Sequence, residues 1–83
     1  MLYVNGKEMA GTFSFSSEYD FTQNPNLVSI SGELELDHYE PVINRIENER
    51  YLLDDVRVIR ESFGSEESSV VYGFVAGSFS LAE

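Results

Sequence analysis

Fifteen acidic side chains oppose five basic ones in this 83-residue chain, and the formal net charge is −10. This balance argues against a nucleic-acid backbone as the main partner, because phosphate binding needs clustered Lys and Arg. The absence of cysteine excludes disulfides and thiolate zinc sites as sources of stability. The length predicts a single domain, residues 1–83, small enough that assembly with other chains is an open route to reinforcement.

The first residues predict a tight hairpin. Residues 2–4 form a short apolar strand, and Asn5-Gly6 follows, the pair favoured in a type I′ turn because both positions need positive φ. The chain should then return towards Met9. We expect neither a signal peptide nor a membrane segment, since no basic and apolar leader precedes the strand and no apolar run approaches ~20 residues.

Two stretches of alternating residues predict a pair of antiparallel strands. Along residues 11–21 the aromatic side chains fall on odd positions, and along residues 28–36 the apolar side chains fall on even positions. Period two over this length is typical of half-buried strands, and we expect these two to pair as a hairpin.

The period changes after residue 36 and predicts one helix at about residues 38–51. The apolar stripe of this helix comprises Tyr39, Val42, Ile43 and Ile46. Pro41 suits the first helical turn, where its missing N–H costs nothing, and Arg50 lies where a cation favours the helix C-terminus.

The last third predicts strands at residues 56–60 and 70–81, separated by a polar loop at residues 63–69. Both faces of the final strand are apolar near residues 70–76, which indicates a central strand or one covered by a partner chain. The order β-β-β-α-β-β predicts an α+β fold, an antiparallel β-sandwich or half-open barrel with one helix. We expect the core to include Phe13, Phe15, Tyr19, Val28, Ile30, Leu34, Val42, Ile46, Val58, Val71 and Val75.

Two groups of surface residues are candidate functional sites. The acidic group, on the solvent face of the two alternating strands, comprises Glu18, Asp20, Glu33 and Glu35. It is either a plain solvated face or an electrostatic surface that repels or mimics DNA.

The second group is a candidate subunit interface, comprising Arg45, Arg57, Arg60, Val70, Tyr72 and Phe74. The arginines would meet acidic surface of an identical neighbour in a head-to-tail contact. The alternative is pairing within the chain, with Glu47, Glu49 and Glu61 as the partners.

No motif predicts catalysis. His38 is the single histidine, and with Asp37 and Glu40 it makes a poor transition-metal site. The serine pairs lack a Gly-x-Ser-x-Gly elbow and have one histidine to serve as a base. We therefore expect no enzyme activity, no catalytic residue, no metal and no cofactor.

Several segments, in order, resemble phage tail-tube subunits of the contractile and long flexible tail type. The similar segments are residues 31–36 (SGELEL), a helix over residues 39–50, residues 70–79 (VVYGFVAGSF) and the opening residues 2–9 (LYVNGKEM). The resemblance implies a virion structural protein that forms a ring or tube around a DNA channel, together with other virion proteins, and is made in the host cytoplasm.

An acidic channel wall would then let DNA slide, because it offers phosphates no binding partner. The alternative is an acidic DNA mimic that inhibits a host DNA-binding or defence protein. Self-association separates the two hypotheses, because a tube subunit assembles with itself whereas a mimic binds one basic protein tightly.

Overall fold

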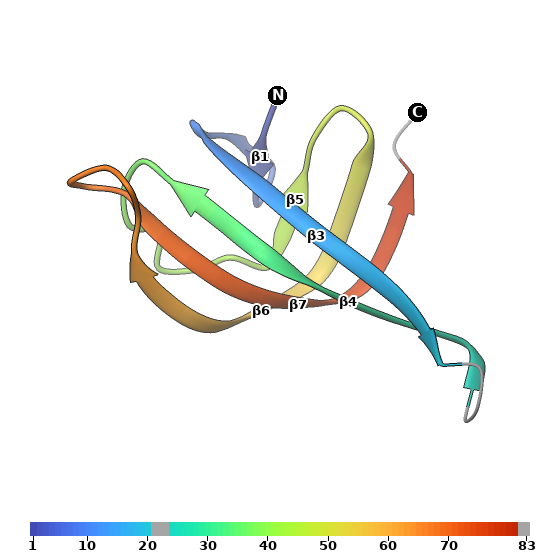
Figure 1. The fold of residues 1–83 in the computed structure, drawn as a ribbon. Helices are drawn as coiled ribbons and strands as arrows, with labels where there is room; N and C mark the ends of the chain where they lie inside the picture. The colour runs from blue at the N-terminus through green and yellow to red at the C-terminus, as the bar shows by residue number, and fades with distance from the viewer. Residues whose placement is uncertain (21–23, 82–83) are drawn as a thin grey trace.

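The computed structural model describes residues 1–20 and 24–81, with side chains described for residues 1–16 and 30–81. These residues form one seven-stranded antiparallel sheet in the order β2-β1-β5-β6-β7-β4-β3, which curls into a half-barrel (Figure 1). The strands are β1 Tyr3–Val4, β2 Lys7–Glu8, β3 Gly11–Asp20, β4 Asn24–Leu36, β5 Arg45–Glu47, β6 Tyr51–Phe63 and β7 Val70–Leu81.

The predicted hairpins are confirmed. Asn5 and Gly6 have φ values of 55° and 81°, as a type I′ turn requires, and Val4 pairs with Lys7 across it. Strands β3 and β4 pair along their length, with Gly11 opposite Leu36. Strand β7 lies between β6 and β4, so the apolar character of both its faces reflects a central position in the sheet.

The predicted α+β class is wrong, because residues 38–51 contain no helix. The segment instead contains β5, followed by a turn into β6. A helix would use the N–H groups of Asn44 and Arg45 for its own carbonyls. Here both donate to the Asn5 side-chain oxygen, at 2.9 and 3.2 Å. No helix among the described residues is long and apolar enough to cross a membrane.

The apolar residues that predicted the helix do not form one buried face, because only half of them are buried. Tyr39 and Val42 are 53% and 57% exposed, while Ile43 and Ile46 are buried. Ile46 pairs with Val4 on one side and Leu53 on the other, which places it in the interior of the half-barrel. The spacing of these residues fits a helix, but the two buried ones lie in strand β5 and in the segment that leads into it.

The core lies on the inner face of the curled sheet. It comprises Leu2, Val4, Ile30, Leu34, Leu36, Ile43, Ile46, Leu53, Val56, Tyr72 and Phe74. Of the predicted core, Ile30, Leu34 and Ile46 are buried, and Phe13, Phe15 and Val58 pack against it.

Three core predictions are wrong. Val42 is exposed, and Val71 and Val75 lie on the outer face opposite Glu35 and Ser31, leaving the inner face of β7 to Tyr72 and Phe74. The predicted core side chains of Tyr19 and Val28 lie outside the described ones.

A local kink lets β6 and β7 follow the curl. Leu53 and Val56 are both buried although they lie three positions apart, so strict alternation breaks between them. Asp55 has a φ of 53° at this point. A Cβ on Gly77 would lie 2.5 Å from the Asp55 carboxylate, so the kink requires glycine on the facing strand.

Candidate functional site

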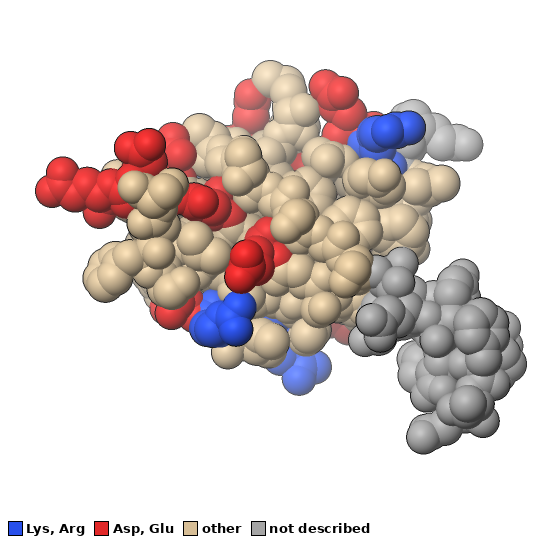
Figure 2. Space-filling model, viewed as in Figure 1, with Lys and Arg blue, Asp and Glu red and all other residues tan. Residues whose placement is uncertain are grey.

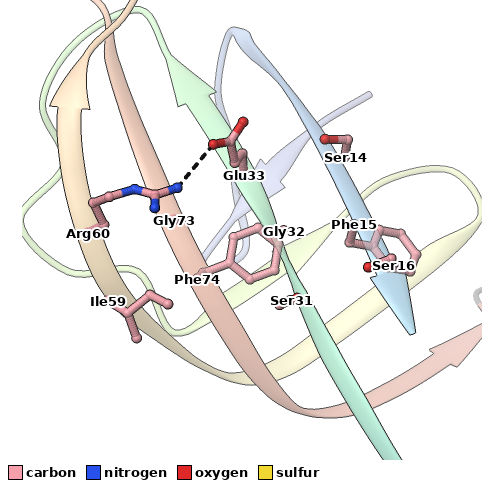
Figure 3. Close-up of a pocket in the computed structure, with 10 residues that line it drawn as sticks. All are labelled: Ser14, Phe15, Ser16, Ser31, Gly32, Glu33, Ile59, Arg60, Gly73 and Phe74. Carbon is pink, nitrogen blue, oxygen red and sulfur yellow. Dashed lines mark hydrogen bonds and ion pairs between the residues drawn. The ribbon is translucent and has the colours of Figure 1, made fainter. Parts of the chain in front are cut away.

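On the outer face of the sheet, an ion pair crosses the central strand β7 and links its two neighbours, β6 and β4. Arg60 and Glu33 both lie opposite Gly73, on either side of the central strand β7. The Arg60 side chain lies over Gly73 and reaches Glu33, with 3.2 Å between guanidinium and carboxylate (Figure 3). Both partners are well exposed, so the pair contributes little stability and chiefly fixes the arginine on the sheet surface.

The ion pair borders an open groove of about 440 Å³ on the outer face. Ser14, Ser16 and Ser31 supply hydroxyl groups from β3 and β4, and Ile59 supplies an apolar wall from β6 (Figure 3). Among the described residues, no group of three or more His, Asp or Glu side chains is placed to hold a metal ion. The groove is thus an open hollow lined by both polar and apolar side chains.

A second acidic residue is held by hydroxyls at one end of the sheet. The Glu35 carboxylate accepts hydrogen bonds from the Ser65 backbone N–H at 3.1 Å and from the hydroxyls of Ser69 and Ser65 at 3.0 and 3.2 Å. The Ser65 backbone bond is the largest of the effects that lower the pKa of Glu35 from its usual 4.5. Glu35 thus anchors the β6–β7 turn and is not a free surface charge.

Four aromatic rings meet across the interior of the half-barrel. Phe15 on β3 lies 5.1 Å from Tyr51 and 5.5 Å from Phe79, measured between ring centroids, and stacks on Phe13 at 5.8 Å. Strand β3 is not a sheet neighbour of β6, so the curl alone brings these rings together. Together with Asn48 they line an open groove of about 490 Å³, called here the aromatic groove.

A single aromatic side chain projects from the opposite end of β6. Phe63 is 91% exposed, although it ends a strand. The neighbouring β6–β7 turn carries Glu66 and Glu67, both exposed. Figure 2 shows acidic side chains gathered at this end of the molecule.

The structure places the predicted acidic group in two different settings. Glu33 is exposed and paired with Arg60, and Glu35 is bound to the turn serines. The side chains of Glu18 and Asp20 lie outside the described ones. For the described members, the outer face of β4 is therefore acidic but partly neutralised.

The predicted interface residues are not gathered on one surface. Arg45 and Arg57 are exposed, and Arg60 is paired within the chain with Glu33. Val70 is half-buried, while Tyr72 and Phe74 are each 1% exposed and belong to the core. Tyr72 and Phe74 therefore have no side-chain surface to offer a neighbouring subunit.

His38 is exposed in the segment before β5. Sequence reasoning overlooked Phe63 and the aromatic groove. The sequence around Phe63 mixes polar and apolar residues and gives no sign that this side chain is exposed. The aromatic groove forms only when the sheet curls, so no local pattern predicts it.

Compared with family models, curated proteins and solved structures, the chain shows no match.

Proposed function

We propose that this chain is a non-catalytic structural subunit of the phage tail-tube kind, which assembles with copies of itself into a ring or tube around a DNA channel. The observation that carries the proposal is the open edge formed by β3. This strand runs for ten residues at one edge of the sheet, whereas the other edge is the two-residue strand β2.

The first seven residues of β3 lack the usual protections of an exposed edge. Residues 11–17 contain neither a charge nor a proline, and Thr12, Ser14 and Ser16 are exposed. A long edge with unpaired backbone groups and no such protection is a template for another strand. Pairing with a neighbouring subunit would satisfy it.

The β3–β4 hairpin extends beyond the rest of the sheet. Strand β4 pairs with β7 only from Ile30 to Leu36, while its pairing with β3 continues to Asn24 (Figure 1). A two-stranded hairpin alone is at best marginally stable in water. Neighbouring subunits in an assembly would supply the missing contacts.

Charge supports the channel part of the proposal. A net charge of −10 on a small domain repels a DNA backbone, so a wall built from such subunits would let DNA pass without sticking. The proposal rests on the sheet and its edge, and does not need the helix expected at residues 39–50.

The test is the solution mass by light scattering over a concentration series, with negative-stain images of the largest species. We expect mass to rise with concentration and rings or short tubes to appear. The variant Thr12→Lys with Ser16→Lys should lower the assembled fraction, because lysines on an edge oppose strand pairing. A monomer up to millimolar concentration that binds one basic protein tightly would instead support the DNA-mimic alternative.

A further inference from the structure

Strand β6 has complementary features at its two ends. Its last residue, Phe63, projects as an apolar knob, and its first residue, Tyr51, lines the aromatic groove. Figure 1 shows the two ends of β6 on opposite sides of the molecule. A knob and a groove on opposite sides of one chain cannot meet each other, but they can meet in two copies.

The knob is large and almost fully exposed to solvent. Phe63 is 91% exposed, beside a hollow of about 260 Å³ lined by Tyr39, Glu61 and Val70. Burying a phenyl ring removes one of the largest apolar areas that a side chain offers. Leaving it in water at a strand end has no benefit for the single chain.

The groove offers the partners that a phenyl ring prefers. Phe15 and Tyr51 already pack edge to face, with an interplanar angle of 81°, and Phe79 is 37% exposed at the open side. Aromatic rings pack favourably in such offset and edge-to-face arrangements. The volume of about 490 Å³ leaves room for one more ring.

Acidic residues lie beside the knob, and one arginine adjoins Tyr51 of the groove in the sequence. Glu66 and Glu67 are exposed in the turn beside Phe63. Arg50 is exposed beside Tyr51, and the nearby Glu49 carboxylate lies 3.4 Å from the N-terminal ammonium group. The acidic end of one copy would therefore face an exposed arginine on the next.

We propose that Phe63 of one copy inserts into the aromatic groove of the next, forming a head-to-tail contact between identical chains. This rests on the proposed self-assembly and adds a second contact, distinct from the β3 edge. A contact between different patches of the same molecule is heterologous, and it propagates into a ring if the rotation closes or a filament if it does not.

The first experiment compares Phe63→Ala with Val42→Ala by sedimentation over a concentration series. Both remove an exposed apolar side chain, but only Phe63 is the knob. We expect Phe63→Ala to weaken association by about 30-fold or more, as buried aromatic anchors do, and Val42→Ala to have little effect. Arg50→Glu should also weaken association, without disturbing the core.

The second experiment is complementation. Phe79→Asp places a carboxylate in the groove but keeps the knob, whereas Phe63→Ala keeps the groove but lacks the knob. Neither variant should form the head-to-tail contact alone, and a labelled Phe63→Ala chain should bind Phe79→Asp chains with wild-type affinity. Urea unfolding checks that Phe79→Asp is folded, and Arg50→Glu takes its place in the mixture if it is not.

The outcomes separate this contact from the proposed function. If Phe63→Ala assembles as wild type does, while the lysine variant of β3 does not, the knob contact is overturned and self-assembly stands. Failure of the mixture to restore binding overturns the knob contact as well. If wild type is monomeric at all concentrations, both proposals fall.

Discussion

The segment between β4 and β5 is held in place by hydrogen bonds from two side chains that are distant in the sequence. The Tyr72 hydroxyl accepts a hydrogen bond from the Glu40 N–H at 2.6 Å and donates one to the Glu40 carbonyl at 3.2 Å. Asn5 holds the same segment further along, where its side-chain amide donates to the Val42 carbonyl at 2.7 Å. Two polar groups thus fix a stretch that has no regular structure of its own.

Removing the Tyr72 hydroxyl should therefore cost more than removing an exposed one. We expect Tyr72→Phe to lower the free energy of unfolding by about 1–2 kcal/mol, because both backbone groups of Glu40 lose their partner. Urea unfolding measures the loss, with Tyr39→Phe as the control on a half-exposed ring. Equal midpoints for the two variants would contradict this account.

The Glu35 carboxylate should make stability depend on acidic pH. Its folded pKa lies below 4.5, so the ionised form favours the folded state; this stabilisation is present above about pH 4.5 and is lost as the pH falls through the folded pKa. Glu35→Gln should reduce that pH dependence and lower stability at pH 7. Unfolding midpoints between pH 2 and 7 measure it. An unchanged slope in Glu35→Gln would contradict this account.

Among the structural elements, the kink at Asp55 and Gly77 determines how far β6 and β7 bend together. Asp55 adopts a left-handed backbone conformation that a non-glycine residue rarely takes, and its side chain occupies the space above Gly77. The two residues are therefore coupled. A change at one alters the cost of a change at the other.

This coupling predicts a rescue. Gly77→Ala should destabilise the protein by about 1–3 kcal/mol, since its Cβ would lie 2.9 Å from the Asp55 Cβ. Asp55→Gly removes that obstacle and suits the positive φ. The double variant should recover most of the loss, as a double-mutant cycle by thermal unfolding would show. Strictly additive effects would mean that the clash is relieved elsewhere.

Strands were predictable from sequence where alternation was long, and the helix prediction failed where the decisive contacts were distant. Residues 39–46 satisfy a helical spacing as well as any short apolar stretch can. Asn5 and Tyr72, far away in sequence, decide against it by taking the backbone groups of that stretch. No local pattern carries that information.

The candidate site was predictable only in part, for the same reason. The apolar faces of the final strand predicted a central or covered position, and the ion pair between Arg60 and Glu33 does cross this strand. The meeting of Phe15 with Tyr51 and Phe79 depends on the curl of the sheet, because these rings touch across its interior. Exposure of Phe63 likewise follows from where β6 ends.

For the whole molecule, the acidic excess dominates long-range interactions. Arg60 is paired with Glu33 on the outer face, and the face in view in Figure 2 shows more acidic than basic side chains. Charge of one sign on so small a body repels other anions over about a Debye length, ~8 Å in physiological salt.

Duplex DNA should therefore not bind. We expect no change in the fluorescence anisotropy of a labelled duplex with up to tens of micromolar protein at ~0.15 M salt, because five cations cannot offset fifteen anions. A basic DNA-binding protein of similar size is the positive control. Sub-micromolar binding would overturn the charge argument and the channel proposal with it.

The strand order also determines when this chain can fold during synthesis. The second sheet neighbour of β4 is β7, and the second sheet neighbour of β1 is β5. Early strands therefore cannot complete their pairing until later strands have been synthesised. Until residue 70 leaves the ribosome, the β3–β4 hairpin cannot join the rest of the sheet, and a two-stranded hairpin is marginal alone. Completion of the sheet is thus a late event with a high loop-closure cost, and the β3 edge, uncharged over residues 11–17, is exposed to other nascent chains until then.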